Sequence, residues 1–144
     1  MPRIDFYLLE QHTPAAHLRT TCRIADKAYR QQHQLLIYCQ DKKQAQELDT
    51  LLWTFHDTSF IPHVLWQNQP STEAPIIICE QSQSLPPQNR DILINLASEA
   101  PDFFSQFQRV IEIVSAEAQA RELARERYRN YRNQGFEIHS HQIK

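Results

Sequence analysis

Glycine is nearly absent from this sequence. Its 144 residues include a single glycine, Gly135. Loops that cradle phosphate groups need residues that tolerate positive φ or lack a side chain, so that backbone N–H groups can reach the ligand. Neither a GxGxxG loop nor a GxxxxGK[ST] loop can therefore be built from this chain. This absence argues against an α/β nucleotide enzyme of the ordinary kind, and we expect no cofactor.

Long apolar runs and paired cysteines are missing as well. No apolar run approaches the roughly 20 residues that span a bilayer. The first residues, MPRIDFYLLEQH, lack the apolar segment and the cleavage site of a secretory signal. The three cysteines, Cys22, Cys39 and Cys79, form an odd and widely spaced set, as is usual where thiols stay reduced. We therefore expect a cytoplasmic protein with no membrane partner.

The residues of common catalytic and metal centres are also scarce. No CxxC, HxxxH or HExxH motif occurs. Cys39 and Cys79 fall in predicted buried strands, where desolvation disfavours the reactive thiolate. His139 and His141 could contact a metal, but two imidazoles on a fraying tail lack a third ligand. We expect no catalytic residue and no metal site, and hence a protein that is not an enzyme.

Hydrophobic patterning predicts one α/β domain spanning residues 1–144. Helical periodicity indicates helices that begin at Thr13-Pro14 and at Asp41, a short helix at 103–107, and a final helix that ends at Gly135. Alternation of strands with helices favours a three-layer domain with a mostly parallel central sheet. Short apolar runs predict the strands of that sheet, of which the last would close it: 3–10, 34–39, 74–79, 91–96 and 109–114.

The final helix, residues 118–136, has an unusual distribution of charge. At roughly 100° per residue, one arc holds four arginines and a tyrosine without any carboxylate. A second face carries Glu122 and Glu126, and a third, apolar face includes Tyr131 and the stem of Arg127. Unpaired guanidinium groups cannot form a core, so the arc predicts a site for an anionic partner. Its members are Arg121, Arg125, Tyr128, Arg129 and Arg132.

Three anionic partners fit this arc: an acidic peptide, a terminal carboxylate or a phosphate backbone. A direct single-stranded nucleic-acid binder would use the same arginines on phosphates, with Tyr128 stacked on a base. The net charge of −2 argues against that reading. A structural alternative is an ordinary solvent-facing helix whose arginines pair with its own glutamates, for example Arg127 with Glu122.

A second candidate surface is the segment Phe60-Ile61-Pro62-His63. Proline prevents a regular ladder there, so the segment is expected at a sheet edge or on a loop. If exposed, Phe60 and Ile61 would form an apolar patch together with Leu65, and such patches mark protein interfaces. The alternative is a loop that faces the core.

Several segments together resemble one known family. They are DFYLLE near the start, LDTLLW at 48–53, SFIPHVL at 59–65, RDILINL at 90–96, and LARERYR-x-YR-x-x-GF at 123–136. Taken in order along nearly the whole chain, they are similar to the chi subunit of bacterial DNA polymerase III.

The resemblance implies a non-catalytic subunit of the clamp-loader assembly, with a Rossmann-like fold that lacks nucleotide binding. It implies two partners: the psi subunit, and the acidic C-terminal tail of single-stranded DNA-binding protein, which ends in a phenylalanine with a free carboxylate. Nucleic acid would be contacted only indirectly. An accessory helicase would compete with psi for the psi surface. The chain would thus be a replication adaptor.

The resemblance also assigns residues to the two partners. The tail would be held by Arg125, Tyr128, Arg129 and Arg132, with Arg121 and Ser140 as outer contacts. Phe60, with its neighbours Ile61, Pro62 and His63, would face psi or the helicase. Two positions depart from the family: Arg129 stands where lysine is typical, and Ile143 stands where a tryptophan occurs in the floor of the peptide pocket.

Overall fold

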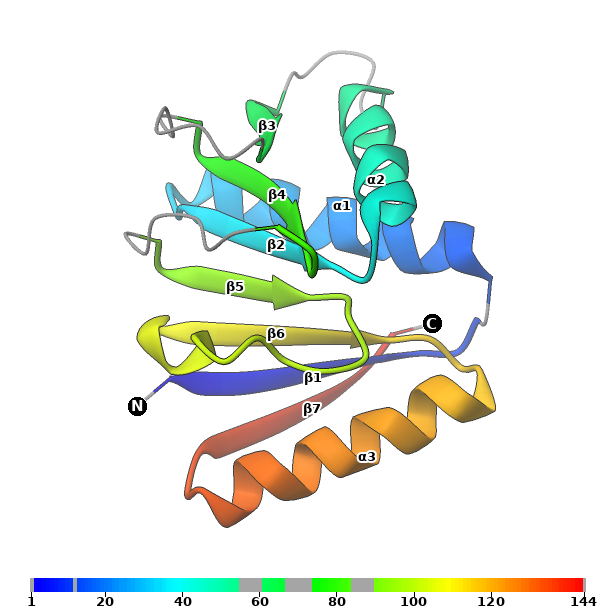
Figure 1. Ribbon diagram of the computed structural model, residues 1–144, viewed down its shortest axis with the longest axis vertical. Helices are drawn as coiled ribbons and strands as arrows, with labels where there is room; N and C mark the ends of the chain where they lie inside the picture. The colour runs from blue at the N-terminus through cyan, green and yellow to red at the C-terminus, as the bar shows by residue number, and fades with distance from the viewer. Residues whose placement is uncertain (1, 12, 55–60, 67–73, 84–89, 144) are drawn as a thin grey trace.

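The computed structural model (Figure 1) describes residues 2–11, 13–54, 61–66, 74–83 and 90–143. Its described strands form one seven-stranded sheet in the order β3-β4-β2-β5-β6-β1-β7. Every pairing between neighbouring strands is parallel. The strands are β1 (Arg3–Leu9), β2 (Leu35–Cys39), β3 (His63–Leu65), β4 (Ile76–Glu80), β5 (Ile92–Asn95), β6 (Arg109–Val114) and β7 (Glu137–Ile143).

Helices cover both faces of the sheet, which confirms the predicted three-layer α/β fold. Helices α1 (Pro14–Arg30) and α2 (Lys42–Thr54) pack on one face, and α3 (Ala118–Asn133) packs on the other (Figure 1). Between 103 and 107 the chain forms only a short 3₁₀ turn, η1 (Phe104–Gln106). None of the described helices has the length and apolar character needed to cross a membrane.

The predicted helix starts are confirmed by their capping hydrogen bonds. The backbone N–H of Ala16 donates to Oγ1 of Thr13 at 3.2 Å, and Pro14 occupies the first turn. At the start of α2, the N–H of Gln44 donates to Oδ1 of Asp41 at 2.8 Å. Each bond satisfies an N–H group that the first turn of a helix leaves without a partner.

The core consists of two apolar layers, one on each side of the sheet. Leu18 and Leu48 belong to the layer under α1 and α2, whereas Tyr131 belongs to the layer under α3. The cysteines lie within these layers. Burial raises the pKa of Cys79 to about 12 and shifts the pKa of Cys39 in the same direction. Such thiols are poor nucleophiles at neutral pH.

Two predictions about the sheet were wrong. The run 109–114 was expected to close it, but β6 lies inside the sheet, with β1 and β7 beyond it. The residues after Gly135 were expected to fray, whereas β7 pairs with β1 along its whole length, from Glu137 beside Arg3 to Ile143 beside Leu9. The segment EIHSHQI has weak intrinsic strand character, and pairing with β1 decides its conformation.

Candidate functional site

Helix α3 is fixed to the sheet by a buried polar network centred on Glu112 of β6. Nε of Arg127 donates to Oε1 of Glu112 at 3.0 Å, and the hydroxyl of Tyr131 donates to Oε2 at 2.5 Å. Asn95 of β5 donates from Nδ2 to both oxygens, at 3.0 and 3.1 Å. The pair between Arg127 and Glu122, considered under the alternative reading of this helix, does not form, because the guanidinium turns inward to a buried carboxylate.

The carboxylate of Glu112 is unfavourable in the core unless its partners stabilise it. Burial raises the pKa of Glu112, and the charge of Arg127 together with the donors of Tyr131 and Asn95 opposes that rise. The Glu112 side chain is fully buried and that of Arg127 is 11% exposed. A buried carboxylate is tolerated only when its partners are in place. The network therefore determines where α3 lies and which of its faces points outward.

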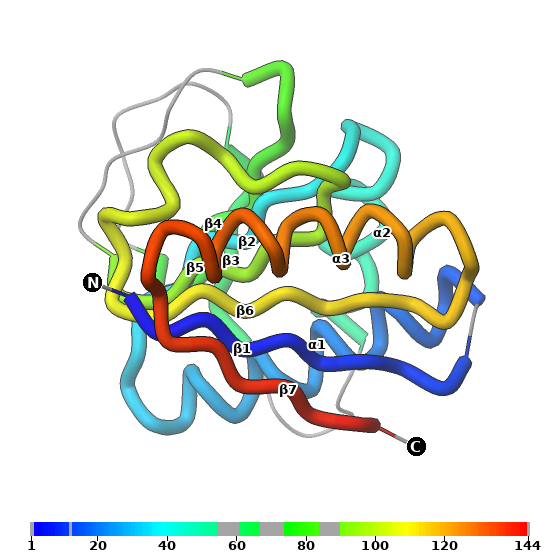
Figure 2. The backbone as a smooth tube through the Cα atoms, turned by 90° about the horizontal axis from the view of Figure 1, so that it is seen from below, coloured from blue at the N-terminus to red at the C-terminus, as the bar shows by residue number. Residues whose placement is uncertain are grey.

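The end of α3 turns the chain back into the sheet. Gly135 adopts φ 88°, the left-handed conformation predicted for it. Its N–H donates to the carbonyl of Arg132 at 3.0 Å, and the N–H of Phe136 donates to the carbonyl of Tyr131 at 3.1 Å. This pair of bonds is a Schellman motif. It leads directly into β7, so that β7 runs beside β1 at the edge of the sheet (Figure 2).

Tyr128 and Ser140 come close to one another through Phe6 of β1. The ring of Tyr128 is 36% exposed and packs on the ring of Phe6, with centroids 5.6 Å apart. Phe6 is paired in register with Ser140 of β7. Ile138 packs in the layer under α3, and Ser140, two residues later, shares that face of the strand. The structure thus places these two predicted residues on one surface.

The four predicted arginines differ in their surroundings. Arg121 donates to the carbonyls of Leu9 and Ser115, at 2.5 and 3.1 Å, and so ties the start of α3 to the sheet. Nη1 of Arg125 lies 3.2 Å from Oε2 of Glu122, and both side chains are well exposed. Exposed pairs of this kind contribute little stability. The prediction that the arc is free of carboxylates therefore fails at Arg125.

Arg129 and Arg132 remain available to a partner. Both are exposed, and within the described part of the chain neither forms an ion pair. Together with Tyr128 and Ser140 they define what we call the arginine face. Its charge is therefore concentrated toward the end of α3, near the start of β7, rather than spread evenly along the helix.

The second predicted surface lies at the other edge of the sheet and differs from the expectation. Phe60 falls outside the described residues. Ile61 is 1% exposed and belongs to the core. His63 is buried: its Nδ1 lies 2.6 Å from the carbonyl of Ile61, and its Nε2 lies 3.1 Å from Oδ1 of Asp49. Neither side chain can present itself to a partner, because the start of β3 folds them onto α2.

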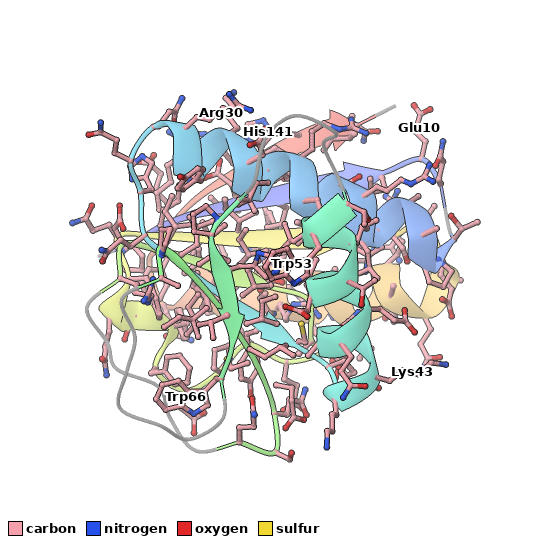
Figure 3. The ribbon with its side chains drawn as sticks, turned by 90° about the horizontal axis from the view of Figure 1, so that it is seen from above. Glu10, Arg30, Lys43, Trp53, Trp66 and His141 are labelled. Atoms are coloured by element: carbon pink, nitrogen blue, oxygen red, sulfur yellow. The ribbon has the colours of Figure 1, made fainter. Side chains whose placement is uncertain are left out.

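The exposed groups at this edge are different ones. Pro62 is half-buried, Val64 is 38% exposed and Trp53 is 53% exposed. Trp53 extends from α2 toward β3, with its ring 5.0 Å from that of His63 (Figure 3). In the sequence, Trp53 was used only as the last residue of the LDTLLW segment. The available signal was its position next to the buried Leu52, because adjacent residues of a helix point to different sides.

The histidines near the C-terminus are engaged with carboxylates. Nε2 of His141 lies 2.9 Å from Oδ1 of Asp5, and Nε2 of His139 lies 2.6 Å from Oε2 of Glu137. Among the described residues there is no group of three or more potential ligands that could hold a metal. Ile143 packs in the layer under α1 and α2. It therefore cannot form the floor of a pocket beside α3.

Comparison with known proteins gives a consistent result over nearly the whole chain. Residues 1–139 match the family model described as DNA polymerase III chi subunit, HolC. The chain is 42% identical to DNA polymerase III subunit chi of Pseudomonas aeruginosa (strain PAO1), covering 99% of this chain and 98% of that protein. It is 38% identical to the subunit of the same name from Escherichia coli (strain K12), covering 97% of each.

Solved structures with the same fold are far more distant in sequence. The crystal structure of T4 UvsW matches with a TM-score of 0.69 at 9% identity, over 98% of this chain and 41% of that one. The Mss116p DEAD-box helicase domain 2, bound to an RNA duplex, matches with a TM-score of 0.68 at 10% identity, over 97% and 64%. These similarities show the fold alone. The family match and the sequence relatives, in contrast, show that this chain belongs to the DNA polymerase III chi subunit family, as a replication accessory subunit.

Proposed function

We propose that this chain is a non-catalytic adaptor that links the psi subunit of the clamp loader to single-stranded DNA-binding protein. The observation that carries the proposal is the position of the two candidate surfaces. The arginine face adjoins β7, and the exposed Trp53 and Val64 adjoin β3. Strands β3 and β7 form opposite edges of the sheet (Figure 1). Two partners can therefore bind at the same time without touching.

The arginine face would hold the acidic tail of single-stranded DNA-binding protein. Acidic side chains are steered toward Arg129 and Arg132, an attraction that salt weakens. The terminal carboxylate pairs with the guanidinium of Arg129, and the terminal ring lies beside Tyr128. A disordered tail loses conformational freedom when it binds, so its dissociation constant should be on the order of micromolar. Such weak binding suits a contact that is made and released repeatedly.

The opposite surface would bind psi, or an accessory helicase in competition with psi. Two of its exposed side chains, Trp53 and Val64, are apolar, and tryptophan is a frequent anchor of protein interfaces. Phe60 remains a proposed contact from the sequence. We assign Ile61 and His63 a supporting role, because they hold β3 against α2 rather than face outward.

Replacing Arg125 with alanine is expected to weaken binding of a labelled acidic peptide by about 1 kcal/mol, roughly fivefold. This loss is smaller than the roughly 1.5 to 3 kcal/mol of a full charge-assisted contact, because Arg125 already pairs with Glu122. Fluorescence anisotropy with a peptide that ends in phenylalanine measures the change. Glu122→Ala is the matched control and should slightly strengthen binding by releasing Arg125. Unchanged affinity in Arg125→Ala would remove this residue from the site.

A gel shift separates this function from direct nucleic-acid binding. The adaptor should not retard single-stranded DNA alone, and it should produce a further shift once single-stranded DNA-binding protein covers the DNA. Retardation of bare DNA, lost in Arg129→Ala, would favour the direct binder.

Replacing Trp53 with alanine is expected to reduce co-purification with psi by at least tenfold. Truncating an exposed tryptophan at the centre of an interface typically costs 2 kcal/mol or more. Binding of the acidic peptide should stay within twofold, since Trp53 lies at the other edge of the sheet. Phe60→Ala is expected to behave in the same way. Loss of both activities together would indicate misfolding or a shared surface instead.

A further inference from the structure

Among the described residues, the backbone groups on the outer edge of β7 have no partner strand. The N–H of Glu10 donates to the carbonyl of Ile143 at 3.1 Å, so the backbone of Ile143 faces β1. Backbone direction alternates along a strand. The N–H and C=O groups of Ile138, Ser140 and Gln142 therefore point away from β1. Among the described residues no strand lies on that side, and Figure 2 shows β7 as the outermost strand.

This edge has few of the features that usually protect a sheet edge, and its one acidic residue, Glu137, lies at its first position. Protected edges are short, or carry proline, lysine or a bulge. Strand β3, at the opposite edge, has three residues and follows Pro62. Strand β7 has seven residues, contains neither proline nor lysine, and follows β1 residue by residue without a bulge. Its backbone is thus a regular template for one more strand.

The charges around this edge favour an acidic occupant. Alternate side chains of an added strand would face the α3 side, where Arg129 and Arg132 are exposed. The remaining side chains would face the other side of β7, where His139 and His141 are already paired with the carboxylates of Glu137 and Asp5. The attraction for an acidic strand therefore comes from the α3 side. A second copy of this chain fits poorly, because pairing of two β7 edges would bring two arginine faces together.

From this geometry we propose that the acidic peptide binds by adding a strand along β7. It forms backbone hydrogen bonds with Ile138, Ser140 and Gln142 while its carboxylates meet the arginine face. The inference rests on the proposed function of that face and defines how its ligand is held. Binding then has two parts. The backbone hydrogen bonds do not depend on the peptide sequence, and the arginines of α3 select peptides that carry carboxylates.

The decisive test uses peptides that carry backbone N-methyl groups. Two versions of one acidic peptide are made, one methylated at odd positions and the other at even positions, and both are measured against the unmodified peptide by anisotropy. Only alternate N–H groups of an added strand face β7. One version should therefore lose about tenfold or more in affinity through its missing hydrogen bonds, while the other stays within twofold.

The outcomes separate this inference from the proposed function. If the unmodified peptide binds and both methylated versions bind equally well, strand addition is overturned and the proposed function stands. If the unmodified peptide does not bind, both are overturned. A difference between the two registers that persists in high salt supports strand addition, because the backbone ladder does not depend on charge.

A protein variant gives a second test from the other side of the interface. Ser140→Pro removes an outward N–H and leaves the ladder to β1 intact, and proline is tolerated at such edge positions. Peptide affinity should fall about fivefold or more relative to Ser140→Ala, the matched reference variant, which removes the same hydroxyl but keeps the N–H. Circular dichroism checks that Ser140→Pro is folded. Equal affinity of folded Ser140→Pro and Ser140→Ala would contradict the proposal.

Discussion

Replacing Arg127 with alanine is expected to lower the free energy of unfolding by about 3 to 5 kcal/mol. The substitution leaves the carboxylate of Glu112 fully buried without its cationic partner, and breaking a buried ion pair on one side has this cost. For a chain of this size the melting temperature should fall by about 10 to 17 °C. Chemical denaturation of the purified protein measures the free energy, and thermal unfolding measures the shift.

The cause of this loss can be identified from its pH dependence. Without Arg127, one influence that lowers the pKa of Glu112 is gone, so the folded-state pKa rises further above the ordinary value of 4.5. The folded protein then holds the proton more tightly than the unfolded chain. Stability of the variant therefore decreases as the pH rises above 4.5. The deficit relative to wild type should be larger at pH 8 than at pH 4.5.

Arg129→Ala is the matched control on the same helix. Its side chain is exposed and makes no ion pair among the described residues, so the free energy of unfolding should change by no more than about 0.5 kcal/mol. A deficit in Arg127→Ala that is the same at both pH values would show instead that the variant loses the packing of the arginine stem.

The different roles of the α3 side chains could be predicted only in part from the sequence. Helical spacing placed Arg129, Arg132 and Tyr128 on one outward arc, and the structure keeps them there. The same spacing placed the stem of Arg127 on the apolar face but could not identify its partner, because Glu112 lies on a different element. One signal was present: a lone glutamate inside the apolar run RVIEIV must find a buried cation or hydrogen-bond donors.

The candidate surface at β3 shows a different limit of sequence reasoning. Proline at position 62 correctly indicated a sheet edge, since β3 is the outermost strand on its side. Exposure of Ile61 did not follow from that position, because the residues flanking a short edge strand can fold inward onto a helix. Strand β7 was missed for a related reason: its conformation comes from pairing with β1, a contact between the two ends of the chain.

Reversing both free charges of the arginine face is expected to abolish binding of the acidic peptide. In the double variant Arg129→Glu/Arg132→Glu, two attractions are replaced by two repulsions. Each charge-assisted contact contributes about 1.5 to 3 kcal/mol, so the dissociation constant should rise at least about 100-fold. Fluorescence anisotropy at low and at physiological salt measures it, and the loss should be greater at low salt.

A control variant with the same change in net charge separates the loss of specific contacts at the arginine face from the effect of overall charge. Lys42 and Lys43 are exposed at the start of α2, on the opposite face of the sheet from α3. The variant Lys42→Glu/Lys43→Glu lowers the net charge by the same amount, and we expect it to weaken peptide binding by less than threefold. Co-purification with psi should survive in both double variants. Similar losses in the two variants would mean that overall charge, rather than the geometry of α3 beside β7, governs the interaction, and the adaptor mechanism would then lose its specific site.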